Sequence, residues 1–228
     1  MKTSVGLLLL ILTPIFLTAR AGEVMIPDIG GGLFNVKVSS LKERRFKTTV
    51  RQQHDYSCGS AALATLLTYH YDYPVSEETV FGSMWEEGDQ PKINREGFSL
   101  LDIKHYLEGI GYSADGYMAP LEKLAAVGVP AIVLIRDNGY NHFVVVRGIQ
   151  DGKVAVADPS MGARVIPLAE FEKMRINRIL FVINGRKEKI VFNHPEDWKI
   201  REEAPVGDVL GTTSLASAHL LRRSPSGF

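Results

Sequence analysis

The sequence predicts an α+β fold, with N-terminal helices packed on a C-terminal antiparallel β-sheet. Apolar residues recur at helical spacing in the first half of the chain, whereas the second half has short runs rich in β-branched residues. Asp151-Gly152 separates two of these runs with the spacing of a hairpin turn. Helices followed by hairpin-connected strands are typical of an α+β domain, and 228 residues are enough for one such domain with a buried core.

The first 21 residues have the pattern of a secretory signal peptide. Lys2 supplies the positive charge, residues 5–17 form an apolar run, and Ala19-Arg20-Ala21 is a cleavage site. The apolar run is short and is interrupted by Pro14, which favours a cleaved signal over its alternative, an uncleaved membrane anchor. We therefore expect an exported protein with no stable membrane insertion after cleavage.

Residues 22–49 are expected to form a lead-in to the main domain. Gly30-Gly31-Gly32 predicts a turn, and residues 33–38 alternate like a half-buried strand. A basic group follows, which is typical of a solvated face, with a binding patch as the alternative. Its members are Lys42, Arg44, Arg45 and Lys47.

The main domain is expected over residues 50–185, and its first half is expected to be helical. Helices are predicted at 58–70, after Ser76, after Ser99 and at 120–127, with a loop at 88–98. Four strands follow, bounded by turns rich in Gly, Asp, Asn and Pro. They are predicted at 131–135, 143–149, 154–157 and 178–183.

Residues 186–228 are expected to be a partly disordered C-terminal extension, with one strand or short helix between 188 and 203.

Composition excludes several classes of function. The chain has 26 Lys+Arg and 26 Asp+Glu, so no overall field favours nucleic acid. It has no paired cysteines of the zinc-binding kind and no glycine-rich phosphate loop, so we expect neither a metal nor a cofactor. An exported chain with a single cysteine cannot close an internal disulfide, so Cys58 is either buried and inert or free and reactive.

Cys58 lies where a polar segment gives way to a helical pattern. Ser57 is a candidate N-cap, which places the thiol in the first helical turn, where the helix dipole favours thiolate. Gly59 and Ser60 leave room for another chain to approach the sulfur. The alternative is a small buried hydrophobe, the common role of a lone cysteine.

A cysteine nucleophile requires a base and a group that orients the base. His142 comes directly after the Asn138-Gly139 turn, at the mouth of a predicted strand, and Asp158 ends the neighbouring strand in an Asp-Pro turn. Each residue has an ordinary structural explanation, but the three together favour a Cys58–His142–Asp158 set. The other histidines lie in helical patterns, in the C-terminal extension or in the nucleophile segment: His54, His70, His105, His194 and His219.

Five segments resemble the bacteriocin-processing cysteine peptidases, cysteine-peptidase family 39. The likeness extends over residues 50–184 and agrees in both the order and the kind of its motifs. Its segments are 52–64 (QQHDYSCGSAALA), 97–104 (GFSLLDIK), 130–135 (PAIVLI), 141–148 (NHFVVVRG) and 157–162 (ADPSMG).

The resemblance implies a papain-like fold with Cys58 as nucleophile, His142 as general base and Asp158 as its orienting partner. The family's oxyanion glutamine corresponds to Gln52, although the adjacent Gln53 stays open. Substrate contacts are expected at Gly59 and Asn141.

Two departures from the family pattern matter. Many relatives carry Asp directly before the cysteine, where this chain has Ser57. No transporter is expected here, so the cytoplasmic leader-peptide substrate of the transporter-linked members does not carry over. The chain is similar to stand-alone exported members, including the periplasmic peptidase of functional-amyloid (Fap-type) secretion systems.

The functional expectation is a periplasmic cysteine endopeptidase that cuts a secreted or periplasmic protein or peptide after small, Gly-Gly-like residues. Its partners would be that substrate and components of a secretion or amyloid system. The alternative is a non-catalytic peptide-binding adaptor or chaperone on the same fold. Acyl transfer to an amine in place of water also stays open.

Overall fold

The computed structural model describes residues 23–27, 33–37, 40–185 and 190–199. The predicted signal peptide, residues 1–21, and most of the predicted C-terminal extension lie outside this range. Contacts divide the chain after Ser40 into two units. In the first unit, β1 (Glu23–Pro27) and β2 (Leu33–Lys37) form an antiparallel hairpin, and β2 corresponds to the strand predicted at 33–38.

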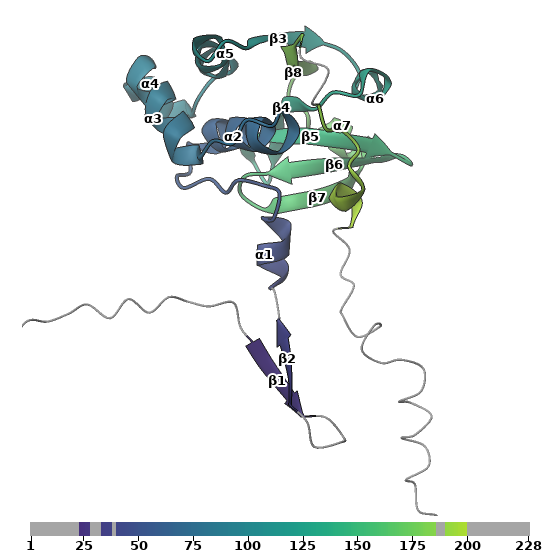
Figure 1. Ribbon diagram of the computed structural model, residues 1–228. Helices are drawn as coiled ribbons and strands as arrows, with labels where there is room; N and C mark the ends of the chain where they lie inside the picture. Colours follow the sequence, from purple (N-terminus) through teal and green to yellow (C-terminus); the bar gives the residue numbers. More distant parts are fainter. Residues whose placement is uncertain (1–22, 28–32, 38–39, 186–189, 200–228) are drawn as a thin grey trace, which may run out of the picture. The chain divides into compact units, whose positions relative to one another are not determined.

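The second unit contains helices and one six-stranded antiparallel sheet of order β3-β8-β4-β5-β6-β7 (Figure 1). Its strands are β3 (Ser113–Met118), β4 (Ala131–Asp137), β5 (Tyr140–Gln150), β6 (Lys153–Asp158), β7 (Gly162–Pro167) and β8 (Ile179–Asn184). Its helices are α1 (Leu41–Arg45), α2 (Cys58–His70), α3 (Glu77–Glu87), α4 (Gln90–Glu96), α5 (Leu100–Gly109), α6 (Glu122–Val127), α7 (Leu168–Met174) and the 3-10 helix η1 (Pro195–Trp198).

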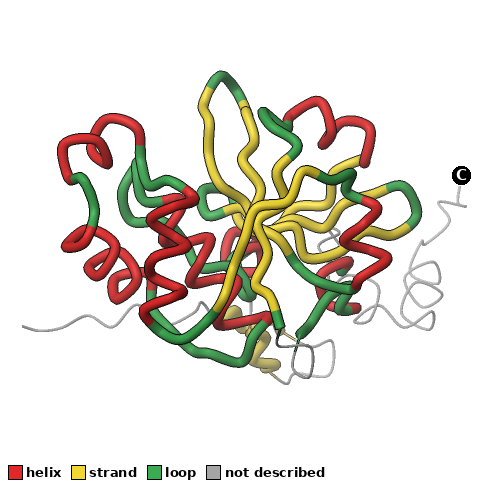
Figure 2. The backbone as a smooth tube through the Cα atoms, turned by 90° about the horizontal axis from the view of Figure 1, so that it is seen from above, coloured by secondary structure: helices red, strands yellow, loops and turns green. Residues whose placement is uncertain are grey.

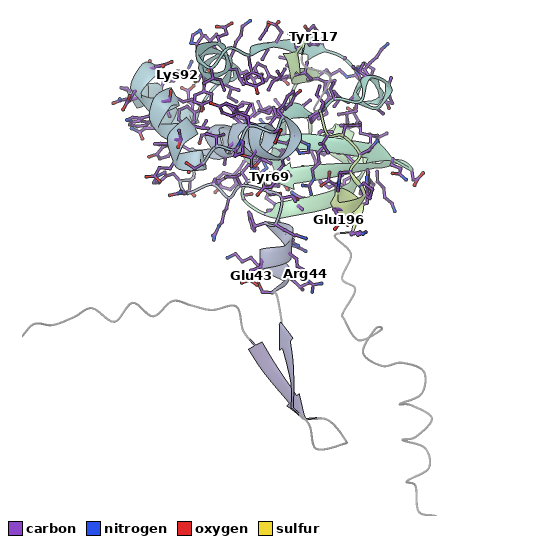
Figure 3. The ribbon with its side chains drawn as sticks, in the orientation of Figure 1. Glu43, Arg44, Tyr69, Lys92, Tyr117 and Glu196 are labelled. Atoms are coloured by element: carbon purple, nitrogen blue, oxygen red, sulfur yellow. The ribbon has the colours of Figure 1, made fainter. Side chains whose placement is uncertain are left out.

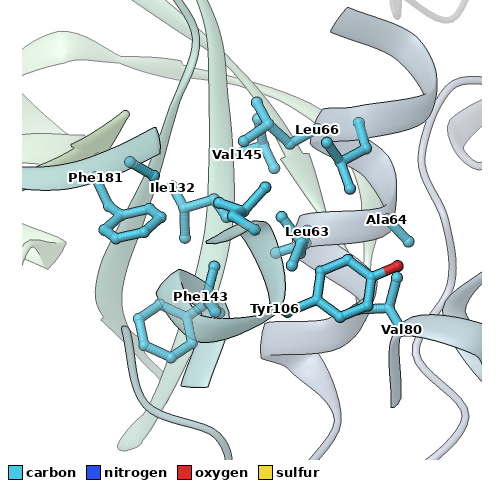
Figure 4. Close-up of a cluster of buried hydrophobic side chains, with 14 of the residues drawn as sticks. Leu63, Ala64, Leu66, Val80, Tyr106, Ile132, Phe143, Val145 and Phe181 are labelled. Atoms are coloured by element: carbon cyan, nitrogen blue, oxygen red, sulfur yellow. The ribbon is translucent and has the colours of Figure 1, made fainter. Parts of the chain in front are cut away.

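Helices cover both faces of this sheet, as Figure 2 shows from above. On one face α2 packs against the central strands, and Leu63 and Leu66 approach Val145 and Ile132 (Figure 4). Because side chains alternate along a strand, Val144 and the other residues out of phase with Val145 lie on the opposite face. There they form a second core, which α6 and α7 cover. Each fully buried Leu or Val side chain stabilises the fold by about 1.5–3 kcal/mol, so α2 is held rigidly where its first turn meets the sheet.

The α+β prediction is confirmed, and so are two of its helix starts. The Ser76 side chain accepts a hydrogen bond from the Thr79 backbone at the start of α3. At α5, Ser99 and Asp102 form a reciprocal capping box. The Asp151-Gly152 hairpin also forms, pairing Gln150 with Lys153 between β5 and β6.

Three regions differ from the prediction. Residues 88–98, predicted to be a loop, contain α4, which Asp89 caps by accepting a hydrogen bond from the Lys92 backbone. Its Pro91 lies in the first turn, where proline is tolerated, so it marks a helix start and not a loop. The first half is not wholly helical, because residues 113–118 form the edge strand β3. β7 and α7 were also missed, because short segments carry little periodicity.

The C-terminal residues 190–199 are fastened to β5. Asn193 bonds both backbone groups of Ile149: its Oδ1 accepts from the Ile149 N–H at 2.7 Å, and its Nδ2 donates to the Ile149 carbonyl at 3.2 Å. A Cβ on Gly148 would lie 2.6 Å from Asn193 Oδ1 and 2.9 Å from Trp198, so glycine is needed for this close approach. The short helix predicted between 188 and 203 corresponds to η1.

A buried ion pair completes this attachment. Arg147 on β5 is 1% exposed, and its Nη1 lies 3.2 Å from Asp197 Oδ1 and donates to the carbonyl and hydroxyl oxygens of Thr48. Glu196, the neighbour of Asp197, points outward (Figure 3). The segment before α2 and the segment at residues 190–199 are therefore joined through one arginine.

Two features are absent from the described part of the chain. None of its helices combines the length and hydropathy needed to cross a bilayer. No cluster of three or more His, Cys, Asp or Glu residues within it is placed to hold a metal ion.

Candidate active site

Cys58 is the first residue of α2, and its side chain is only 7% exposed. The helix that follows is buried on almost every side, because small residues let it pack centrally against the sheet. Gly59 shows this packing: a Cβ there would lie 3.0 Å from Phe98 and 3.5 Å from Phe143. Phe98 and Phe143 thus occupy the space beside this glycine.

The prediction that the Ser57 side chain caps α2 is wrong. Ser57 occupies the N-cap position, but its backbone angles are φ −99° and ψ 15° instead of extended, and its side chain makes no capping hydrogen bond. Its Oγ instead accepts a hydrogen bond from the His54 backbone N–H at 3.1 Å. Ser57 therefore shapes the loop before the helix and does not cap it.

Burial raises the pKa of the Cys58 thiol. Backbone N–H groups of Phe143, Gly59 and Cys58 act in the opposite direction, and the negative charge of Asp158 adds to the rise. We expected the helix start to favour thiolate at Cys58, and for the sulfur without a neighbouring cation this expectation is wrong. Desolvation of the sulfur outweighs the effect of the helix dipole. A thiolate here requires a neighbouring cation.

His142 on β5 and Asp158 on β6 lie side by side. His142 Nε2 lies 3.4 Å from Asp158 Oδ2, with side-chain exposures of 15% and 0%. This contact is long for a hydrogen bond, and His142 Nε2 has no partner of good geometry. With Nε2 facing the carboxylate, Nδ1 is the ring nitrogen left to accept a proton.

Asp158 is held in place by its own turn. Its Oδ1 accepts hydrogen bonds from the Ser160 backbone at 2.9 Å, the Ser160 hydroxyl at 2.7 Å and the Met161 backbone at 3.1 Å. Burial alone would raise its pKa, but contact with His142 and the bonds from Ser160 outweigh burial and hold the pKa well below its usual value. Asp158 is therefore a fixed negative charge beside the imidazole.

The sequence did not identify Arg164 as a site residue. From β7, its Nη1 donates to Asp158 Oδ2 at 3.0 Å and to Asp137 Oδ2 at 2.7 Å. Burial would lower the pKa of Arg164, but the two carboxylates outweigh that effect, so the net shift is upward and the guanidinium stays charged. The turn at 159–162 could have signalled that residue 164 returns beside Val156, its partner in the β6–β7 pairing.

Gln52 and Gln53 are in different surroundings. Gln52 is half-buried: its backbone N–H donates to the Pro159 carbonyl at 3.1 Å, and its side-chain Nε2 donates to the His54 carbonyl at 3.0 Å. An amide NH₂ has two hydrogens, so one remains for another acceptor. Gln53 is exposed.

Asn141, the other expected substrate contact, is exposed beside His142, and its Oδ1 accepts a hydrogen bond from Arg136 at 2.9 Å.

Comparison with known proteins identifies the family. Residues 47–187 match the peptidase C39 family. The probable functional amyloid protease FapD of Pseudomonas aeruginosa is 40% identical over 181 residues, covering 79% of this chain and 80% of that protein. The protein of the same name from Pseudomonas fluorescens is 37% identical over 215 residues, covering 91% of this chain and 93% of that protein.

The fold is also that of a solved structure. The peptidase domain of Streptococcus ComA, a bifunctional ABC transporter, superposes with a TM-score of 0.52 at 19% identity, covering 61% of this chain and 98% of that domain. The helices and antiparallel sheet thus form the papain-like peptidase fold. The chain belongs to the peptidase C39 family and is a cysteine-type peptidase.

Proposed function

We propose that the protein is an exported cysteine endopeptidase in which Cys58 is the nucleophile, His142 the general base and Asp158 the orienting group. The observation that carries this assignment is the position of one dipeptide on β5. His142 contacts Asp158 through Nε2, and the next residue, Phe143, packs beside Gly59 and lies in the same buried cluster as Cys58. The dipeptide thus joins the proposed base, which contacts its orienting group, to the packing around the start of α2, where Cys58 lies.

In the proposed reaction, His142 Nδ1 takes the proton from Cys58 Sγ, and the thiolate attacks the carbonyl carbon of the scissile peptide bond. The resulting oxyanion is stabilised by the Cys58 backbone N–H and by the free hydrogen of Gln52 Nε2. The C–N bond then breaks and the imidazolium protonates the leaving amine. Water hydrolyses the remaining thioester and releases the acid product.

The raised pKa of Cys58 fits this scheme. A buried sulfur that is uncharged by itself becomes a thiolate only together with a protonated His142, because the attraction between the two charges offsets the cost of desolvating them. The negative charge of Asp158 favours that imidazolium. The three groups therefore act as one unit.

We propose a secreted or periplasmic protein of an amyloid secretion system as the substrate. The two Pseudomonas relatives are named as probable functional amyloid proteases, and the first 21 residues have a signal-peptide pattern. Cleavage after small residues of the Gly-Gly kind follows from the family resemblance. The exposed Asn141 beside His142 and the backbone at Gly59 are the proposed substrate contacts.

Profiling of newly formed N-termini tests this proposal without prior choice of substrate. Periplasmic proteins from cells lacking the gene are incubated with the purified protein or with its Cys58→Ser variant, and new termini are identified by mass spectrometry. We expect termini that require Cys58 and are preceded by small residues. New termini that form equally with Cys58→Ser would contradict the proposed nucleophile, and large residues before the cut would contradict the proposed specificity.

A further inference from the structure

A row of alternating charges runs from the catalytic pair across four strands. His142 on β5 contacts Asp158 on β6, Asp158 contacts Arg164 on β7, and Arg164 contacts Asp137 at the end of β4. The distances are 3.4, 3.0 and 2.7 Å in that order. Neither outer residue is freely solvated, since the Arg164 and Asp137 side chains are 22% and 19% exposed.

Arg164 and His142 share one oxygen of Asp158. Both contacts are to Oδ2, and the arginine is closer than the imidazole. The other oxygen, Oδ1, is occupied by three hydrogen bonds from the Ser160–Met161 turn. A cation fixed on Oδ2 cancels part of the negative potential that reaches His142.

Asp137 acts on Arg164 in the opposite direction. It accepts the shortest of the three Nη1 hydrogen bonds, so it neutralises part of the charge that Arg164 applies to Asp158. It also joins the β4–β5 hairpin, which carries His142, to the β6–β7 hairpin, which carries Asp158. Removal of Arg164 and removal of Asp137 should therefore have opposite electrostatic effects at His142.

We propose that Arg164 and Asp137 are a positioning pair that sets how strongly Asp158 stabilises protonated His142, and thereby the pH range over which Cys58 is reactive. This inference rests on the catalytic roles proposed above. Arg164 contacts Asp158, and Asp137 contacts Arg164. Both residues are therefore proposed to act on His142 through the Asp158 carboxylate, without contact with the reacting atoms.

The other charged groups near His142 are engaged elsewhere. On β4, Arg136 is exposed and donates to Asn141. Ile135 is the cross-strand partner of His142, and it also forms an isolated β-bridge with Arg175. The Arg175 side chain is paired with Glu172 at 2.8 Å. On the helical side, the titratable residue of the proposed site is Cys58, at the start of α2. Within the described residues, Asp158 is thus the carboxylate in contact with the imidazole, and Arg164 and Asp137 act on that carboxylate.

Alkylation of Cys58 by iodoacetate across pH 4 to 10 tests the proposal on the mature protein. Iodoacetate is an anion, so it reacts fastest with a thiolate beside a protonated imidazole, and the falling alkaline limb of the rate reports loss of that proton. We expect Arg164→Gln to move the midpoint of this limb upward by about half a unit to one unit. Asp137→Asn should move it downward, and the double variant should return it toward the wild-type value.

Arg164→Lys, which keeps the charge, should keep the limb near its wild-type position. A purely structural role predicts slower alkylation at every pH with no opposed shifts. Midpoints that stay in place, or that move in the same direction in both variants, would overturn the proposal. If Arg164→Gln does not fold, Asp137→Asn alone tests the inference. A downward move of its alkaline midpoint supports the inference, and an upward move or an unchanged midpoint contradicts it.

His142→Ala separates this inference from the proposed function. If the wild-type profile has no alkaline limb and matches that of His142→Ala, the catalytic pair itself is wrong. If the limb is present in wild type and lost in His142→Ala, the pair stands, and the Arg164 and Asp137 variants then test the inference by itself.

Discussion

The backbone N–H of Gln52 donates a hydrogen bond to the carbonyl oxygen of Pro159, with a nitrogen–oxygen distance of 3.1 Å. The two residues are far apart in the sequence, and each is next to a different part of the proposed machinery. Gln52 belongs to the segment that leads into Cys58, and Pro159 directly follows Asp158. This bond therefore fixes the proposed oxyanion donor relative to the carboxylate that orients the base.

The two adjacent glutamines provide a matched test of the oxyanion site. We expect Gln52→Ala to lower kcat by about 10²–10³-fold with little change in KM, because the donor acts mainly on the charge that forms in the transition state. Gln53→Ala should be close to wild type, because Gln53 is exposed. Steady-state cleavage of one peptide substrate measures both variants, and the reverse order of effects would assign the role to Gln53.

Substitution of Asp158 should separate orientation from charge. Asp158→Ala removes the group that faces His142 Nε2 and should lower kcat/KM by about 10²–10⁴-fold. Asp158→Asn keeps an acceptor oxygen, as in papain-like enzymes with asparagine, and should retain more activity than the alanine variant.

Asp151→Asn is the matched control for Asp158→Asn, because Asp151 is an exposed residue of the β5–β6 turn. It should leave kcat/KM unchanged. Equal activity of Asp158→Ala and wild type would remove Asp158 from the proposed mechanism.

The buried pair of Arg147 and Asp197 should govern stability and not chemistry. Asp197→Ala leaves a 1%-exposed guanidinium without its carboxylate, which costs about 3–5 kcal/mol of unfolding free energy. Glu196→Ala is the adjacent control, because Glu196 is exposed and its side chain is paired only with Lys199 among the described residues. Denaturant unfolding compares the two, and equal losses would show that residues 190–199 are not clamped through Asp197.

Stability should fall in mild acid because of His70. Burial lowers its pKa to about 4, and the charge of Arg147 adds to this effect against the hydrogen bond to Val191. An unfolded histidine takes a proton near pH 6.5, so between that pH and about 4 the unfolded chain binds one more proton than the folded one. His70 should therefore contribute a loss of about 1.4 kcal/mol per pH unit as the pH falls through this window.

His70→Asn retains a donor for the Val191 carbonyl and removes the titration. Its unfolding free energy should depend less steeply on pH between 6.5 and 4 than that of the wild type. His105→Asn, at an exposed position on α5, should keep the wild-type slope. An unchanged slope in His70→Asn would assign the acid sensitivity to other groups.

The candidate site residues that the sequence singled out are those with local signals. Cys58 begins a helical pattern, His142 follows a turn into a strand, and Asp158 ends a strand before proline. The structure brings His142 and Asp158 into contact, and Phe143, next to His142, packs beside Gly59 in the cluster that contains Cys58. The long strands and the helices α3 and α5 were predictable for the same reason, since each carries a period or a serine N-cap, whereas α4 with its Asp89 cap was missed.

What could not be predicted depends on neighbours that are distant in the sequence. Arg164 is a single arginine in a short strand, and only the pairing of β7 with β6 places it beside Asp158. The raised pKa of Cys58 depends on burial by residues from several elements, which no local pattern encodes. Ser57 has the composition of a cap, but its backbone conformation sends its oxygen to His54 instead.

The most direct test of the central claim is covalent labelling of the mature protein at neutral pH with a peptidyl electrophile that captures activated thiols. Intact mass and peptide mapping would locate the adduct. We predict one adduct on Cys58, a labelling rate that falls by about 10²-fold or more in His142→Ala, and an unchanged rate in His54→Ala, whose exposed ring stacks on Tyr56. A Cys58 that stays unlabelled until the protein unfolds, or that labels equally fast without His142, would contradict the account.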